Sequence, residues 1–345
     1  MTEYTKYDQI IATWFHADSD ADSGVYSQTL GGSTRSGHYE VYFRCVEIFF
    51  ESLSNFKRTE KRLFFTNQLG YEVSSLKFKK KLLDLNVEIV VLENSHIPPQ
   101  NFGLKWRNQF YLIDILNYLA HYNCDTFIFD SDVIAMSDEE IEFESNSELI
   151  LLVISDIQDE EINGLQVADI GRLFAERTQK QPKRLSKYYG GEFLGIRGDS
   201  IQKFSELMDY HFDLNLEASA TGGIYLREEA HLISLVSQEF SVSENGSNLI
   251  QRIWTQPWTF RKIPENLEEL IFWHLPAEKK TGFKFFYSNM SSALENGWKG
   301  MEQEKWKNLV SETFGVRKYT YRKLIRDIFH LRSGVFRHLK NRIIK

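Results

Sequence analysis

The stretch Thr126-Phe-Ile-Phe-Asp-Ser-Asp-Val-Ile-Ala135 places two aspartates, separated by one serine, directly after an apolar segment. The apolar residues 126–129 predict a buried β-strand that ends at the polar residues. Carboxylate oxygens are the ligands that Mg²⁺ and Mn²⁺ prefer, and both ions keep open positions for further oxygen ligands. We therefore predict that Asp130 and Asp132 bind a divalent metal at the carboxyl end of this strand. The pattern is also typical of an Asx turn, in which aspartates accept hydrogen bonds from backbone N–H groups.

Extended and helical patterns alternate on both sides of this stretch. Short apolar runs predict strands at 10–15, 62–66, 87–92, 126–129, 149–155 and 188–196. Apolar residues at helical spacing predict helices at 39–56, 73–83, 106–122, 199–212 and 228–236. The alternation is typical of an α/β fold with a mostly parallel sheet flanked by helices, which binds ligands at the carboxyl ends of its strands. Residues 156–187 predict a helix and a loop over that edge, and residues 254–260 and 270–275 complete the body.

The composition predicts one large globular domain followed by a short basic tail. The chain has 345 residues, of which 42% are hydrophobic, so it can bury a full core. We assign residues 1–315 to this domain and residues 316–345 to a basic helical tail. The polar start predicts neither a signal peptide nor a membrane stem, and no apolar run approaches the roughly 18 residues that span a bilayer. Cys45 and Cys124 are predicted to be reduced thiols, which favours a cytoplasmic location.

Basic charge is concentrated in the tail. Ten Lys and Arg residues and one acid, Asp327, lie between Arg317 and Lys345, although the whole chain has a net charge of −7. The remaining body is therefore strongly acidic, which argues against general nucleic-acid binding. Apolar residues, many of them at helical spacing, lie among these cations: Tyr321, Leu324, Ile325, Ile328, Phe329, Val335, Phe336, Leu339 and Ile343. Such a helix either lies in the headgroup layer of an anionic membrane or packs its apolar stripe on the body or on a partner subunit.

Four blocks of sequence carry a resemblance to a known family. A helix and strand end in Phe65-Thr66-Asn67-Gln68, and Trp106-Arg107 begins the helix that precedes Asp130-Ser131-Asp132. Further along are Tyr188-Tyr-Gly-Gly-Glu-Phe-Leu-Gly195 and Glu228-Glu-Ala-His-Leu232. In this order the blocks resemble the GT-A glycosyltransferases. They are most similar to the retaining family that contains the histo-blood-group A and B transferases and α-1,3-galactosyltransferase.

This resemblance implies a Rossmann-like GT-A fold that binds a nucleotide sugar, most often UDP-linked, with Mn²⁺ or Mg²⁺. Asp130-Ser131-Asp132 matches the segment that holds the metal and the diphosphate. Glu229 matches the catalytic glutamate, which acts as a nucleophile or stabilises an oxocarbenium-like centre. Glu228 matches a neighbouring acid that binds sugar hydroxyls, and His231 is assigned the same role. Taken without the resemblance, Glu229 is a solvated carboxylate in the first turn of a helix, and His231 is as readily a structural residue.

A second group of residues is assigned to the donor. Tyr189, Gly190, Gly191 and Glu192 are predicted to shape the sugar pocket. The glycines let the backbone approach the sugar closely, or else they mark a strand bulge. Arg107 is predicted to bind diphosphate oxygens with its guanidinium group, or else to lie on a helix surface.

The two ends of the predicted body supply the remaining site residues. Thr13, Trp14 and Phe15 occupy the place where GT-A proteins hold the nucleotide base, so an aromatic ring there either stacks on the base or packs in the core. His274 and Lys284 loosely resemble the His-x-x-Gly-x-x-Lys segment of glycogenin-like retaining transferases, with a longer spacing. The resemblance implies that His274 is a third metal ligand and that Lys284 contacts the diphosphate.

Together these features predict a retaining transferase that moves a hexose or N-acetylhexosamine to a glycan or lipid-linked acceptor. By analogy, the lack of a predicted stem favours synthesis of bacterial capsule or other surface polysaccharide. One alternative is a sugar-nucleotide pyrophosphorylase, although no strand is predicted immediately before Gly31-Gly32, where its phosphate loop would lie. Another is a degenerate GT-A scaffold or glycan-binding partner, against which the Asp-x-Asp motif and Glu229 argue.

Overall fold

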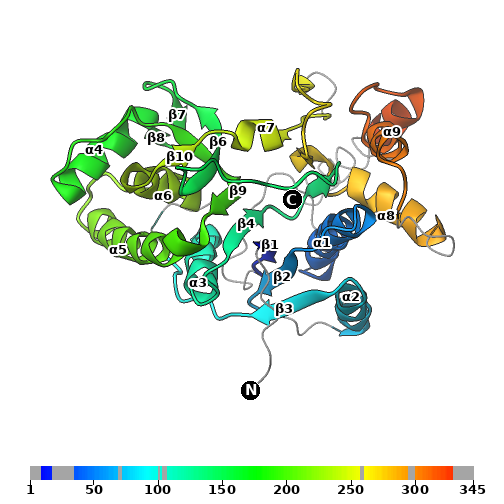
Figure 1. Cartoon of the computed structure of the whole chain (residues 1–345), viewed down its shortest axis with the longest axis horizontal. Helices are drawn as coiled ribbons and strands as arrows, with labels where there is room; N and C mark the ends of the chain where they lie inside the picture. The colour runs from blue at the N-terminus through cyan, green and yellow to red at the C-terminus, as the bar shows by residue number, and fades with distance from the viewer. Residues whose placement is uncertain are drawn as a thin grey trace, which may run out of the picture.

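A seven-stranded sheet forms the centre of the molecule (Figure 1). The computed structural model describes residues 9–17, 35–68, 72–99, 102, 107–256, 260–293 and 300–328. The strands are β1 (Gln9–Phe15), β2 (Lys61–Thr66), β3 (Val87–Val91), β4 (Asp125–Phe129), β6 (Leu149–Ser155), β9 (Tyr188–Ile196) and β10 (Val242–Ser243), in the order β10-β6-β9-β4-β1-β2-β3. β9 runs antiparallel to both neighbours, and the other neighbouring pairs are parallel. The predicted α/β fold with a mostly parallel sheet is therefore confirmed.

Helices cover both faces of this sheet. They are α1 (Arg35–Asn55), α2 (Glu72–Asp84), α3 (Tyr111–Leu119), α4 (Val167–Thr178), α5 (Ile201–Ala220) and α6 (Glu229–Val236). Successive side chains of a strand point to opposite faces. Ile11 and Phe15 of β1 accordingly pack with α1 and α2, whereas Ile10 and Ala12 pack with α3, α5 and α6. Both faces are buried, and the carboxyl ends of β1, β2 and β4 meet at one edge of the sheet.

A smaller sheet extends from that edge. It contains β5 (Val133–Ala135), β11 (Ile250–Arg252) and β12 (Phe272–His274), and near it lie α7 (Gly246–Leu249), α8 (Gly282–Ala293) and α9 (Gln303–Phe314). Trp273 of β12 and Trp306 of α9 are buried in a third core that also includes residues of α1 and α8. β12 pairs antiparallel with β5, and His274 lies opposite Val133. This register places His274 beside the segment that follows β4.

A tight hairpin occupies the segment predicted as a helix and a loop over the site. β7 (Glu161–Ile162) and β8 (Leu165–Gln166) are joined by Asn163 and Gly164, whose φ angles are +50° and +85°. An Asn-Gly pair with two positive φ angles is the preferred chemistry of a two-residue hairpin turn. The helix predicted in this segment is α4, which begins directly after the hairpin.

Some predicted boundaries differ from the structure. The helix predicted at 106–122 is a 3₁₀ turn at Arg107–Phe110 followed by α3, and Trp106 lies outside the described residues. The helix predicted at 199–212 continues as α5 to Ala220. The segment predicted at 254–260 contributes a β-bridge between Trp254 and Lys262, and residues 257–259 lie outside the described ranges. These ends depend on tertiary contacts that local propensity does not encode.

The first part of the tail packs against the body through charged side chains. Residues 321–328 form a helix, and Lys323 and Asp327 on it are buried. The apolar side chains Tyr321, Ile325 and Ile328 are exposed instead. Three of the four stripe side chains in this helix therefore do not pack on the body, whereas Leu324 is half-buried. The choice between a membrane surface and a partner subunit stays a prediction. The stripe residues Phe329, Val335, Phe336, Leu339 and Ile343 lie outside the described part of the chain.

Among the residues that the structure describes, no helix has both the length and the apolar character needed to cross a bilayer.

Candidate active site and metal centre

A cavity of about 360 Å³ opens at the carboxyl ends of β1 and β4. It brings together many of the predicted site residues: Trp14, Phe15, Asp130, Ser131, Gly191, Glu192, Glu228, Glu229 and His274 line it. They come from β1, the segment after β4, β9, the start of α6 and the end of β12. A polar cavity at this edge is the usual place for a ligand in an open α/β sheet.

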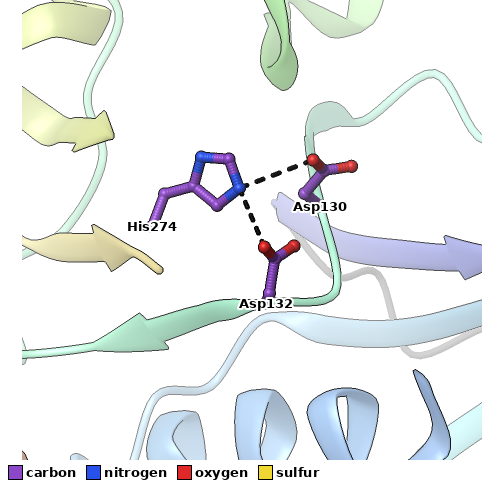
Figure 2. Close-up of side chains that lie close together, drawn as sticks. All are labelled: Asp130, Asp132 and His274. Atoms are coloured by element: carbon purple, nitrogen blue, oxygen red, sulfur yellow. Dashed lines mark hydrogen bonds and ion pairs between the residues drawn. The ribbon is translucent and has the colours of Figure 1, made fainter. Parts of the chain in front are cut away.

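Three side chains at one end of the cavity could hold a metal ion. The Nε2 atom of His274 lies 3.2 Å from Oδ2 of Asp132 and 3.6 Å from Oδ2 of Asp130 (Figure 2). One potential ligand atom from each residue lies within 4.8 Å of the other two. Asp132 and His274 are buried, so the cluster is part of the folded interior rather than a group of solvated acids.

Backbone contacts fix the geometry of this cluster. The backbone N–H of Asp130 donates to the carbonyl of Glu192 on β9, with a nitrogen–oxygen distance of 3.0 Å. The N–H of Leu275, next to His274, donates to the carbonyl of Asp132, also at 3.0 Å. The segment after β4 is thus tied to β9 on one side and to the end of β12 on the other. This explains how residues more than a hundred positions apart converge.

Lys279 supplies a cation to the same cluster. Its Nζ atom lies 3.1 Å from Oδ1 of Asp132, and its side chain also lines the cavity. Burial raises the pKa of Asp132, but Lys279 and His274 outweigh it and hold that pKa well below its usual value. Conversely, burial lowers the pKa of His274, but Asp132 and Glu192 outweigh it and raise that pKa. Asp132 is therefore a carboxylate at neutral pH.

The donor set suits a hard or borderline divalent ion. Two carboxylates and one imidazole are ligands that Mn²⁺ accepts, and three protein ligands leave coordination positions open. The Nδ1 atom of His274 faces Oε1 of Glu192 at 3.8 Å, so Nε2 is directed toward the two aspartates. At 3.8 Å this contact is an ion pair and not a hydrogen bond, and Nδ1 of His274 makes no hydrogen bond within the described structure. Asp130, Asp132 and His274 thus fit the ion that the sequence predicts.

Glu192 is held by a neighbouring arginine. The two carboxylate oxygens of Glu192 accept bonds from Nε and Nη2 of Arg252, the latter at 2.8 Å. Burial raises the pKa of Glu192, but Arg252 and His274 outweigh it and lower that pKa. Glu192 was predicted to bind the sugar. It lines the cavity, yet its oxygens are already engaged by Arg252 behind the metal ligands.

Glu229 begins α6 and lies in the wall of the cavity. Its side chain is buried, and its Oε2 atom makes no hydrogen bond within the described structure. Burial, Glu228 and Asp130 raise the pKa of Glu229 well above its usual value. A Cβ atom at Gly191 would overlap the Glu229 carboxylate, and one at Gly190 would overlap that of Glu192. The two glycines therefore leave room for carboxylates, in addition to any approach to a sugar.

Glu228 lies next to Glu229 in a different environment. Asn163 of the β7–β8 turn donates to both oxygens of Glu228 at 2.8 Å, and the Tyr188 hydroxyl donates at 2.6 Å. His231 donates through Nε2 to the Ile162 carbonyl at 3.0 Å and accepts the Arg227 backbone N–H at Nδ1. Burial lowers the pKa of His231 more than Glu228 raises it. His231 is therefore a neutral residue that attaches the hairpin to α6.

The end of β1 forms the opposite wall. Thr13 is buried and donates to the Phe129 carbonyl at 2.9 Å, and the ring of Phe15 stacks on Tyr42 at 4.8 Å. Trp14 is half-buried beside Tyr111, with ring centroids 6.0 Å apart. Thr13 and Phe15 are thus mainly core residues, whereas Trp14 presents part of an aromatic ring to the cavity.

Several predicted residues are not brought into the cavity lining. Arg107 donates to the Pro98 carbonyl at 2.8 Å, and Lys284 is exposed on α8. Tyr189 is buried and points to Glu244, with its hydroxyl 3.4 Å from Oε1. Gly190, His231 and Thr13 are also absent from the described lining, and Asp132 lies buried beneath it. Gly31-Gly32 lies outside the described residues.

Sequence reasoning missed several lining residues: His16, Tyr42, Gln109, Asn163, Arg252, Trp254 and Lys279. Lys284 was predicted to contact the diphosphate, but the lysine that lies beside Asp132 is Lys279. No sequence motif marks Lys279. It reaches Asp132 because a 3₁₀ turn at Pro276–Glu278 directs the chain back toward that residue. The Asn163-Gly164 dipeptide did carry a turn signal that predicts a hairpin tip.

Comparison with known proteins adds no family to these observations. No protein-family model matches the chain, and no curated protein matches it at a significant level. The residues of the cavity are therefore what supports a function.

Proposed function

We propose that the chain is a metal-dependent glycosyltransferase. It transfers a hexose or N-acetylhexosamine from a nucleotide sugar, with UDP as the proposed nucleotide, to a glycan or lipid-linked acceptor with retention of configuration. One observation carries the proposal: the cluster of Asp130, Asp132 and His274 lines or underlies the same cavity as the buried Glu229. A metal site beside a buried acid suits cleavage of a sugar–diphosphate bond, because the metal stabilises the leaving group and the acid acts at the sugar.

The residues near Asp132 bind the diphosphate end of the donor in this proposal. Asp130, Asp132 and His274 hold Mn²⁺ or Mg²⁺, which when bound supplies Lewis-acid stabilisation of the departing diphosphate. Lys279 lies on the same side of the cavity and adds a second positive charge. Ammonium groups neutralise phosphate oxygens as point charges. When the sugar–oxygen bond breaks, its electron pair leaves on the diphosphate, where these charges are concentrated.

Glu229 acts at the sugar in this proposal. In its ionised form it is a nucleophile or stabilises positive charge at the anomeric carbon. Because Asp130 contributes to the raised pKa of Glu229, a cation bound at Asp130 favours the ionised form. Glu228 is held by Asn163 and Tyr188 and borders the same part of the cavity, where its carboxylate accepts hydrogen bonds from sugar hydroxyls.

The base end of the donor is assigned to the edge of β1. Trp14 and His16 line the cavity there. The Nε2 atom of His16 lies 3.1 Å from Nδ2 of Asn67 and 3.0 Å from Nδ2 of Asn94, so two amides orient the imidazole. The half-buried indole of Trp14 can stack on a planar base, and the oriented imidazole of His16 can meet the polar edge of that base.

Donor hydrolysis tests this function. UDP-, GDP- and dTDP-sugars are incubated with the protein in Mn²⁺ or in EDTA, and release of the nucleoside diphosphate is measured. We expect metal-dependent release from one donor, its loss in Asp132→Ala, and its retention in Asp138→Ala, since Asp138 is an exposed acid close in sequence. No release from any donor, with no metal-dependent nucleotide binding, would reject the transferase. Glycan binding by both wild type and Glu229→Ala would then favour the scaffold.

The tail helix provides a surface for an anionic membrane in this proposal. Tyr321, Ile325 and Ile328 are exposed at i, i+4 and i+7 spacing, and Arg322 is exposed beside them. Apolar side chains with adjacent cations suit the headgroup layer of anionic lipids, which would bring a lipid-linked acceptor near the enzyme on the inner face of the plasma membrane. Sedimentation with phosphatidylglycerol vesicles, but not phosphatidylcholine vesicles, is expected, and Tyr321→Ser/Ile325→Ser should abolish it.

A further inference from the structure

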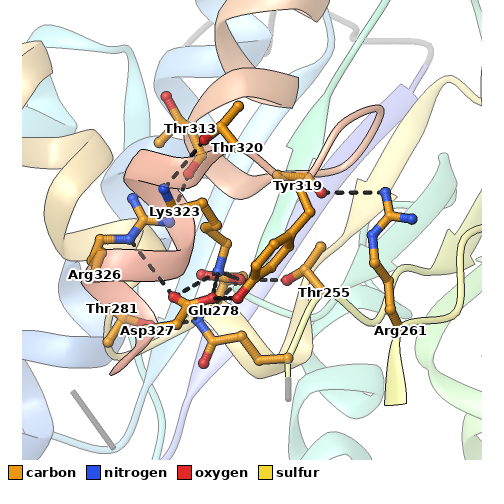
Figure 3. A network of polar contacts seen from close by, with 12 residues as sticks. Thr255, Arg261, Glu278, Thr281, Thr313, Tyr319, Thr320, Lys323, Arg326 and Asp327 are labelled. Atoms are coloured by element: carbon orange, nitrogen blue, oxygen red, sulfur yellow. Dashed lines mark hydrogen bonds and ion pairs between the residues drawn. The ribbon is translucent and has the colours of Figure 1, made fainter. Parts of the chain in front are cut away.

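A buried charge cluster attaches the tail helix, residues 321–328, to the body. It lies on the side of the helix opposite the exposed side chains Tyr321, Ile325 and Ile328. The Nζ atom of Lys323 lies 2.6 Å from Oε1 of Glu278 and 2.9 and 2.8 Å from the two oxygens of Asp327 (Figure 3). Lys323 and Glu278 are almost fully buried, and Tyr319 donates its hydroxyl to Asp327. Two carboxylates therefore share one ammonium group in the interior.

This cluster joins two segments that line the cavity. Glu278 accepts hydrogen bonds from Thr255 and from Gln256, the latter at 3.2 Å, and Gln256 also donates to Asp327 at 2.9 Å. Thr255 and Gln256 directly follow Trp254, a cavity-lining residue. The tail helix is thus bonded at the same point to the segment that follows β11 and to the turn that follows β12.

Glu278 and Lys279 are consecutive and are held from opposite sides. Glu278 ends the Pro276–Glu278 turn and points to Lys323, whereas Lys279 points to Asp132. The turn that carries them is closed by a hydrogen bond from the Glu278 N–H to the Leu275 carbonyl at 3.0 Å. A rotation of this turn that releases Glu278 therefore moves the Cα atom of Lys279 relative to the metal cluster.

We propose that Lys323 is a positioning residue for Lys279, and that it acts through its ion pair with Glu278. The inference rests on the proposed function, because it assigns Lys279 to the diphosphate of the donor. The tail helix is then part of the donor site, although it does not touch the cavity. Loss of the Lys323–Glu278 ion pair leaves Glu278 with only its hydrogen bonds to Thr255 and Gln256. The turn is then held less tightly, and Lys279 no longer keeps one place beside Asp132.

Two substitutions remove the Lys323–Glu278 ion pair in different ways. Lys323→Met leaves the carboxylates of Glu278 and Asp327 buried without their cation, which threatens the fold itself. Glu278→Gln is gentler, because Lys323 keeps Asp327 as a counter-charge and the glutamine amide retains the shape of the side chain. Glu278→Gln therefore tests positioning in a protein that stays folded, and thermal unfolding verifies this for each variant.

The readout is equilibrium binding of UDP in the presence of Mn²⁺, with GDP and dTDP measured in parallel, so no acceptor or turnover is needed. We expect Glu278→Gln and Lys323→Met to weaken UDP binding about 3- to 10-fold, and Lys279→Met to weaken it about 10-fold or more. In the Lys279→Met background, Glu278→Gln should cause no further loss, since its effect passes through Lys279. Lys318→Met, an exposed cation of the same segment, should bind UDP like wild type.

The outcomes separate the inference from the proposed function. If wild type binds none of the nucleotides with Mn²⁺, the donor site is absent and both proposals fall. If Lys279→Met weakens UDP binding while folded Glu278→Gln binds like wild type, only the positioning role is overturned. Full additivity of Glu278→Gln and Lys279→Met would also overturn it, because the tail would then act by another route. The positioning role is supported if Glu278→Gln weakens UDP binding only when Lys279 is present.

Discussion

Gly191 of β9 lies so close to Glu229 at the start of α6 that a Cβ atom at position 191 would overlap the glutamate carboxylate. The two residues belong to different elements, and the close approach holds Oε1 of Glu229 against the β9 backbone. Oε2 is left without a hydrogen-bond partner in the described structure. A strand glycine therefore sets the position of the buried acid in the cavity.

Gly191→Ala should displace Glu229 while leaving the protein folded. Overpacking a buried site costs about 1–3 kcal/mol of stability, and a 1 Å displacement of a reacting group lowers a rate by about 100-fold. We expect donor hydrolysis to fall by about that factor, with UDP binding little changed, as measured by kinetics and equilibrium binding. Gly223→Ala is the control, because its Cβ would meet neighbouring atoms no closer than 3.4 Å. Equal losses of hydrolysis in the two variants would contradict this account.

Glu229→Gln should stabilise the metal-free protein at neutral pH. The raised pKa of Glu229 means that the folded chain keeps its proton while the unfolded chain, with a pKa of about 4.5, has lost it. The wild type therefore loses stability as pH rises above about 4.5, by about 1.4 kcal/mol for each pH unit until the folded group ionises. A glutamine at this position does not ionise, so its contribution to stability does not change with pH. Denaturant unfolding in EDTA at about pH 4.5, 6 and 7.5 should show curves that coincide at low pH and separate as pH rises. A pH-independent difference would show that Glu229 is not buried as an acid.

Arg252→Met should destabilise the fold and weaken Mn²⁺ binding. It leaves the carboxylate of Glu192, whose side chain is 2% exposed, without its partner behind His274. Removal of one member of a buried ion pair costs about 3–5 kcal/mol. We expect the low end of that range, because the Arg252 side chain is 33% exposed. Arg252→Met/Glu192→Gln should recover most of the unfolding free energy, since no unpaired charge remains. Chemical denaturation and Mn²⁺ titration measure both effects. A double variant no more stable than Arg252→Met would refute the ion-pair explanation.

His96, which does not line the cavity, should make the stability of the fold depend on pH. Its Nδ1 lies 2.9 Å from Asp114 and its Nε2 lies 2.7 Å from Asp209. Burial lowers the pKa of His96, but the two aspartates outweigh it and raise that pKa above the usual 6.5. The stabilisation is present in full below about pH 6.5 and is lost as pH rises through the folded pKa. Because Asp209 is partly exposed, we expect about 1 kcal/mol or less. His96→Gln should remove this pH dependence from unfolding curves, whereas His121→Gln, at an exposed position, should preserve it.

Local pattern predicted the strand before Asp130 and the helix that begins near Glu229. A buried parallel strand reads as a continuous apolar run, and this signal is contained within a few residues. The helix 106–122 was predicted less well, since the 3₁₀ turn that opens it at Arg107 is not distinguished by apolar spacing.

Contacts between distant segments were not predictable in the same way. Lys284 was chosen for the diphosphate by analogy of spacing, yet the turn after His274 brings Lys279 to Asp132. Asn163 reaches Glu228 from a hairpin 65 residues earlier in the chain. Each of these contacts depends on the packing of whole elements, which a single sequence does not specify position by position.

The sequence by itself determined the alternating strands and helices, the acids at the end of β4, and the concentration of basic charge after Arg317. These features follow from residue type and short-range spacing, so they need no knowledge of distant partners. The resemblance to known transferases had already placed His274 and Glu229 with those acids, whereas the tertiary structure alone decided that Lys279 joins them and that Lys323 is buried against Glu278. The physical reason is strand register and core packing: pairing of β12 with β5 and of β9 with β4 fixes which side chains meet at the sheet edge.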